Sequence, residues 1–78
     1  MSINIENLIR NEIFVMCKNA RRAGYDYIVV KTIWISRKLE RLGIPIKAIN
    51  PLWSKIIDGA CINRKKAGVL VINCYCFS

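Results

Sequence analysis

Lysine and arginine side chains are the groups in this sequence best able to do chemistry, and the chemistry they favour is the binding of anions. The 78 residues include 13 Lys and Arg against 5 Asp and Glu, which gives a formal net charge of +8. Side chains that neutralise phosphates release counterions, so a polyanion binds well to such a surface. The charge predicts a nucleic acid or another polyanion as the partner. The alternative is that the excess charge only keeps a small apolar protein soluble.

The candidate nucleic-acid-binding residues lie in three places along the chain. They are expected on the outer side of a second helix, on either side of a short third helix, and in a hairpin turn, where exposed cations can reach phosphates. In that order they are Arg37, Lys38 and Arg41, then Lys47 and Lys55, then Arg64, Lys65 and Lys66. An ordinary solvated charged surface is the alternative for the cations of the second helix and for those of the hairpin.

A further basic group has a structural explanation. Lys18, Arg21 and Arg22 fall in the last turns of a predicted first helix. Cations there interact favourably with the carbonyl end of the helix dipole. We therefore leave these three residues out of the predicted binding set.

The sequence argues against catalysis. It contains no histidine, the usual acid–base residue near neutral pH, and its five carboxylates are isolated from one another. No glycine-rich phosphate-binding loop is present. The prediction is a protein that is not an enzyme and that uses no cofactor.

The four cysteines are Cys17, Cys61, Cys74 and Cys76. They include no Cys-x-x-Cys pair and have no histidine to complete a zinc site, so no metal is predicted. Cys74 and Cys76 would point to the same face of a strand, which suits two small buried side chains. Without a secretory signal, all four are predicted to be buried reduced thiols.

The aromatic residues are assigned to structure. Trp34 and Trp53 lie among Ile and Leu residues at helical spacing, which predicts that both are buried in the core. Stacking on bases is the alternative function for them. Tyr25, Tyr27 and Tyr75 are too scattered along the sequence to predict a stacking platform.

The first predicted element is an amphipathic helix. Apolar residues recur at spacings of three and four from Ile5 to Ala20. Asn4 is a suitable N-cap, and Gly24 is a suitable left-handed residue just after the helix.

The second element is ambiguous. Residues 25–35 are rich in β-branched and aromatic side chains, which favours a strand. Asp26, however, is a good N-cap, and an apolar face then continues to Leu42. We favour a helix from about Tyr27 to Leu42 and leave the strand open as the alternative for residues 27–35.

The last third of the chain predicts a short helix and a hairpin. Asn50 and Pro51 suit the N-cap and the first helical position, and Asp58-Gly59 suits the end of this helix. Two strands are expected over residues 60–63 and 69–77, joined by residues 64–68. The predicted fold is a single α+β domain over residues 1–78, with three helices followed by a C-terminal β-hairpin.

This order of elements resembles a winged helix-turn-helix. The stretch from Ser36 to Ile44 is similar to the first helix and turn of such a motif, with Gly43 at the bend. The resemblance implies that the third helix enters the major groove of DNA and that the hairpin touches the backbone. The leading hypothesis is a small transcriptional regulator that binds duplex DNA.

The apolar content supports two further expectations. Hydrophobic residues make up 54% of the chain, more than so small a domain can bury alone. The surplus predicts a homodimer. It also supports a rival function, in which the protein is an inhibitor or adaptor that docks an apolar surface on a larger protein.

The sequence predicts no membrane partner, and binding to a membrane surface through a basic amphipathic helix is the third alternative function. The longest apolar-rich run, Tyr25 to Ile35, is interrupted by polar residues and is too short to span a bilayer. The first residues have neither the basic start nor the apolar stretch of a signal peptide. A cytoplasmic, intracellular location is the resulting prediction.

Overall fold

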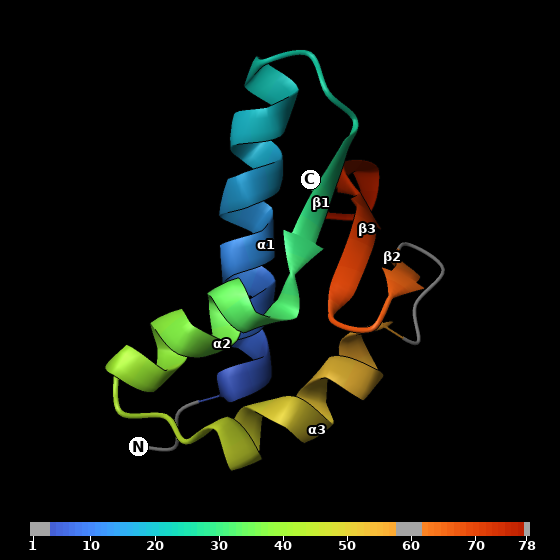
Figure 1. Ribbon diagram of the computed structural model, residues 1–78. Helices are drawn as coiled ribbons and strands as arrows, with labels where there is room; N and C mark the ends of the chain where they lie inside the picture. The colour runs from blue at the N-terminus through green and yellow to red at the C-terminus, as the bar shows by residue number, and fades with distance from the viewer. Residues whose placement is uncertain (1–3, 58–61, 78) are drawn as a thin grey trace.

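The computed structural model describes residues 4–57 and 62–77, and in this part of the chain it has an α+β fold (Figure 1). Three α-helices accompany a three-stranded antiparallel sheet and a short 3-10 helix, which confirms the predicted class. The elements in chain order are α1 (Ile5–Arg22), β1 (Tyr27–Lys31), α2 (Thr32–Arg41), α3 (Ile46–Ile57), β2 (Ile62–Lys66), β3 (Val69–Asn73) and the 3-10 helix η1 (Cys74–Phe77).

Helix α1 begins and ends where the sequence predicts. The Asn4 side chain accepts a hydrogen bond from the Asn7 N–H at 3.1 Å, as an N-cap does. Gly24 has a φ of 92°, and the Tyr25 N–H donates to the Ala20 carbonyl at 2.9 Å. This pattern closes the last carbonyls of the helix and turns the chain back toward the sheet.

The predicted helix over residues 27–42 is wrong in its first part. Tyr27 to Lys31 form strand β1, and α2 begins at Thr32. Strand β1 pairs antiparallel with β3, so that Tyr27 lies opposite Asn73 and Lys31 lies opposite Val69. The pairing partner is about forty residues away in the chain, and its hydrogen bonds and packing override the local capping signal.

Helix α3 begins earlier than predicted. It runs from Ile46, so Pro51 lies inside the helix and Asn50 is not its N-cap. Proline cannot donate a hydrogen bond to the carbonyl of Lys47, four residues before it. Both Lys47 and Pro51 are exposed, so water can satisfy that carbonyl. Burial of Ile49 on the opposite side of the helix favours the longer element.

The hairpin is shorter and tighter than predicted, and it is part of a larger sheet. Strands β2 and β3 are joined by the two residues Ala67 and Gly68, and Lys66 lies opposite Val69. The sheet order is β1-β3-β2, so β3 is the central strand. The predicted basic loop over residues 64–68 is therefore wrong, because Arg64, Lys65 and Lys66 belong to β2.

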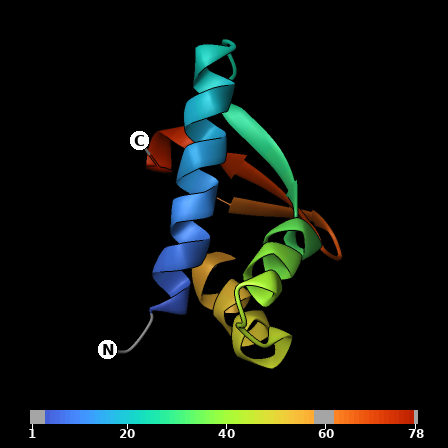
Figure 2. The ribbon, with the colours of Figure 1, turned by 90° about the vertical axis from the view of Figure 1, so that its left-hand side faces the viewer.

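The helices lie on one side of the sheet, with α2 and α3 at one end and the second half of α1 reaching toward the other (Figures 1 and 2). The core between them is mainly aliphatic, with Trp53 and the Cys17–Cys74 disulfide also buried. Its fully buried members include Ile9 and Ile13 from α1, Ile49 from α3, and Leu70 and Ile72 from β3. No helix in the part of the chain that is described is both long and apolar enough to cross a membrane.

The prediction of reduced cysteines is wrong. Cys17 of α1 and Cys74 of η1 form a disulfide, with their Cα atoms 5.2 Å apart and both residues buried. Cys76 is also disulfide-bonded. Cys74 and Cys76 do not share the face of a strand, because β3 ends at Asn73 and both lie in η1. The fold brings together cysteines that are 57 residues apart, which no local spacing reveals. Cys61 lies outside the described residues.

Candidate nucleic-acid interface

One side of α3 is polar, basic and exposed. Lys47, Asn50, Ser54 and Lys55 are exposed on this helix, and the helix contains no acidic residue. Their spacing of three, four and one residues places them on one broad stripe. Amides and hydroxyls can read the edges of bases, while lysines can reach phosphates or guanine. The structure thus brings the sequence-predicted Lys47 and Lys55 together with Asn50 and Ser54, which were not among the predicted binding residues.

The opposite side of α3 fixes its position. Ile49, Trp53 and Ile56 are buried in the core at spacings of four and three. The indole N–H of Trp53 donates to the hydroxyl of Ser36 on α2 at 3.2 Å, in a buried hydrogen bond. Burial of Trp53 confirms the structural prediction made for it. The two helices are thereby tied together, and α3 has a rigid support.

The cations of α2 divide into two kinds. Arg37 and Arg41 are exposed. Lys38 instead makes an ion pair with Glu12 of α1, with 2.9 Å between its Nζ and a carboxylate oxygen. This ion pair joins α2 to α1, so Lys38 already has a partner within the protein. Of the three predicted binding residues on α2, Arg37 and Arg41 are therefore the better placed to bind a partner.

The hairpin contributes one described cation near its turn. Lys66 is exposed at the end of β2, immediately before Ala67 and Gly68. The pairing is irregular between Arg64 and Lys66. Arg64 and Lys65 lie in the same strand, and the directions of their side chains fall outside what the structure describes.

Trp34 does not occupy the core, contrary to the sequence prediction. It is 54% exposed in the first turn of α2, and the Lys31 ammonium lies 5.8 Å from the centre of its ring. Ile33 and Val29 are also exposed. The helical spacing that predicted burial counted β1 as part of the helix. Once the chain is a strand up to Lys31, Trp34 falls on the outer side.

A second group of exposed residues was missed by sequence reasoning. Tyr25, Tyr27 and Tyr75 are 57%, 55% and 59% exposed, and the fold brings them to one end of the sheet. The Cys74 N–H donates to the Asp26 carbonyl at 2.9 Å, and Tyr25 and Tyr75 flank that hydrogen bond. The sequence alone could not predict this grouping, because it depends on the pairing of β1 with β3, two strands that are far apart in the chain.

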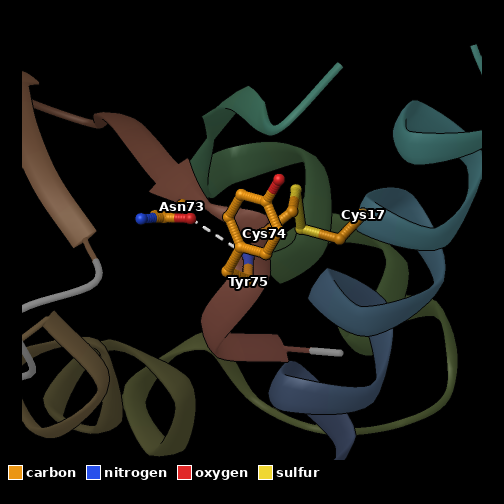
Figure 3. Close-up of a disulfide and its surroundings, with 4 residues drawn as sticks. All are labelled: Cys17, Asn73, Cys74 and Tyr75. Carbon is orange, nitrogen blue, oxygen red and sulfur yellow. Dashed lines mark hydrogen bonds between the residues drawn. A yellow bond between two sulfur atoms is a disulfide. The ribbon is translucent and has the colours of Figure 1, made fainter. Parts of the chain in front are cut away.

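One cation contacts this tyrosine group, and two more lie on the same part of α1. The guanidinium of Arg21 lies over the Tyr75 ring, 5.3 Å from its centre. Lys18 and Arg22 are exposed on the same last turns of α1. Figure 3 shows how Tyr75 is held: its backbone N–H donates to the Asn73 side chain at 3.0 Å, next to the Cys17–Cys74 disulfide.

Comparison with known proteins gives no family for this chain. It matches no protein-family profile, no curated protein and no solved structure at a significant level.

Proposed function

We propose that the protein is a small DNA-binding regulator of winged-helix type, in which the exposed side of α3 contacts the major groove. The observation that carries the proposal is the separation of the two sides of α3. One side packs into the core, and the other offers Lys47, Asn50, Ser54 and Lys55 without any carboxylate. A helix needs these features to lie between two phosphate backbones and reach base edges.

The order of elements supports this proposal. Helix, strand, helix, helix and hairpin follow one another, and only four residues connect Arg41 of α2 to Ile46 of α3. In a winged helix-turn-helix the hairpin touches the DNA backbone beside the reading helix. Here the hairpin turn has two residues, so we assign it a minor contact through Lys66. The role is one of binding and involves no catalysis.

A selection experiment tests the proposal. A pool of random-sequence duplexes is enriched by binding to the protein, and the parent should enrich a preferred sequence. Asn50→Ala removes an exposed amide from α3 without changing the charge, and we expect it to relax the preference at one or two positions, at a cost of about 1–3 kcal/mol of discrimination per lost base contact. Asn11→Ala, at an exposed position on α1, should leave the preference unchanged. Absence of duplex binding by the parent even at low salt would exclude the function.

One observation favours the rival function. Val29, Ile33 and Trp34 are large, apolar and exposed around the junction of β1 and α2. Such residues suit a hydrophobic docking surface on another protein, and they also suit the predicted homodimer. Binding through this surface should persist at high salt, whereas binding to phosphates should weaken steeply. Sedimentation of the protein alone tests the homodimer, and a monomer of about 9 kDa at high concentration would exclude it.

A further inference from the structure

We infer that the tyrosine end of the molecule is a binding site for single-stranded nucleic acid, separate from α3. The site consists of Tyr25, Tyr27 and Tyr75 at one end of the sheet and of the exposed cations on the last two turns of α1, Lys18, Arg21 and Arg22, with Arg21 over the Tyr75 ring. This site does not depend on the proposed duplex-binding function, because it uses other residues and reads no base pairs.

The first argument is the exposure of the rings. Each of the three tyrosines exposes more than half of its surface, although large aromatic side chains are normally used for burial. Sites for unpaired strands use exposed aromatic rings, because every base has a face that can stack on them. A paired duplex hides those faces. The exposed rings therefore favour unpaired bases over a duplex.

The second argument is the local charge. Lys18, Arg21 and Arg22 are exposed on the last two turns of α1, and Asp26 is the exposed carboxylate of the adjoining loop. In the described part of the chain, the ion pairs join Arg10 to Glu6 and Lys38 to Glu12, and none involves these three cations. A basic groove that tracks the backbone beside stacking rings is the usual design of a site for single strands.

The third argument is that the site is held in place. The disulfide joins Cys74 to Cys17, which lies one helical turn before Arg21 on the same side of α1. Tyr75 follows Cys74 directly, and its N–H is bonded to Asn73 (Figure 3). Arg21 then rests over the Tyr75 ring. The ring and the guanidinium are thus positioned before any ligand arrives, which lowers the entropic cost of binding.

The position of the site separates it from α3. Figure 1 shows η1 and the start of β1 beside the second half of α1, while α2 and α3 lie at the opposite end of the molecule. Changes at the tyrosines can therefore be made without touching the helix proposed to contact duplex DNA.

The test measures binding of a fluorescent oligothymidylate of about 12 nucleotides to the oxidised protein by anisotropy. Tyr25→Ala and Tyr75→Ala should each weaken binding by about tenfold, because each removes a stacking surface. Tyr25→Phe and Tyr75→Phe keep the ring and should bind within about twofold of the parent. Circular dichroism checks that each variant is folded. Tyr25 lies in a loop, so its variant remains informative if Tyr75→Ala does not fold.

Two controls make the result specific. An abasic strand of the same length keeps the phosphates but has no bases, and it should bind more weakly than the oligothymidylate. Arg10→Ala removes a cation from α1 at the end remote from the tyrosines, and it should cost less than either tyrosine change.

The inference fails if the alanine variants bind as tightly as the parent, if the phenylalanine variants lose as much affinity as the alanine variants, or if the abasic strand binds as tightly as the oligothymidylate. The last result would reduce the site to an unspecific basic patch. A folded parent that binds no oligothymidylate at low salt would also overturn it, and the exposed rings would then be assigned to a protein contact.

Discussion

The α3 end and the tyrosine end both present exposed cations, but they are built in different ways. Around α3, the described contacts are packing and a hydrogen bond: Ile49 and Trp53 pack into the core, and Trp53 donates to Ser36. At the tyrosine end, a disulfide clamps η1 to α1. The exposed side of α3 has lysines and small polar groups, whereas the other end has tyrosines and arginines. Both ends are therefore basic, but the cations lie beside small polar side chains on α3 and beside aromatic rings at the tyrosine end.

Net charge alone does not define which nucleic acid a surface suits. Lysines beside amides and hydroxyls suit a duplex groove, whose bases are accessible only at their edges. Cations beside aromatic rings suit bases that are unpaired. If the two ends are independent, changes at one end should leave binding at the other intact.

Removal of the Cys17–Cys74 disulfide should have the largest effect on stability. The double change Cys17→Ala and Cys74→Ala releases a closed loop with a sequence separation of 57, for which loop entropy predicts a loss of about 4 kcal/mol. Urea unfolding of the parent and the variant measures the difference. Binding of the oligothymidylate should weaken more than binding of the duplex under conditions where the variant is folded. A loss under about 1 kcal/mol would show that the clamp is not what stabilises the tyrosine end.

Truncation of Ile49 should have the next largest effect. Ile49 is fully buried on the inner side of α3, so Ile49→Ala leaves a cavity and should cost about 3 kcal/mol. Ile33→Ala makes the same chemical change at a residue that is 47% exposed on α2, and it should cost about 0.5 kcal/mol or less. Equal losses for the two variants would contradict the assignment of the buried and exposed sides.

The Ser36 change should have an intermediate effect. Ser36→Ala leaves the buried indole N–H of Trp53 without its acceptor, which should cost about 1–2 kcal/mol. Ser54→Ala alters an exposed hydroxyl on α3 and should change the free energy of unfolding by less than about 0.5 kcal/mol. If the two serine variants unfold at the same urea concentration, the hydrogen bond does not tie α2 to α3.

The ion pair between Lys38 and Glu12 should have the smallest effect. Lys38→Ala should destabilise the protein by about 0.5 kcal/mol, because the lysine side chain is 60% exposed and water screens the pair. Arg37→Ala removes the neighbouring exposed cation. It should change the free energy of unfolding less than Lys38→Ala does, but it should weaken duplex binding more. The reverse order for DNA binding would move Lys38 back into the contact surface.

Local signals predicted the parts of the fold that depend on neighbouring residues. Asn4 and Gly24 mark the two ends of α1, because a cap and a left-handed glycine act within a few residues. Strand β1 was not resolved by the same reasoning. Its β-branched residues favoured a strand, but the partner that decides the question, β3, begins at Val69. Long-range pairing outweighs propensity in such segments.

The same limit applies to the candidate sites. The stripe on α3 was partly predicted, because Lys47 and Lys55 flank a helix that the sequence indicated. Asn50 was misassigned as a cap, since the Asn-Pro pair is a common helix start and the buried Ile49 was not weighed against it. The tyrosine end depends on strand register and on a disulfide across 57 residues, and neither can be read from spacing.

The disulfides also bear on the predicted cytoplasmic location. Disulfides persist in oxidising compartments and in the cytosol of hyperthermophiles, and they are rare in an ordinary reducing cytosol. The disulfides therefore favour an oxidising compartment over the predicted cytoplasmic location, unless the cytosol is that of a hyperthermophile. Mass spectrometry of the protein isolated without reductant measures their state directly.

The assignment of duplex binding to α3 is tested by two variants that each lose two cations. Lys47→Ala with Lys55→Ala alters α3, and Lys18→Ala with Arg22→Ala alters the last turns of α1; all four side chains are exposed. The measured quantity is the slope of log affinity for a short random duplex against log salt concentration. We expect the α3 variant to bind more weakly, with a slope smaller in magnitude by roughly two, while the α1 variant keeps the parent's slope. Equal changes in both variants would mean that only net charge matters, and would contradict the assignment of duplex binding to α3.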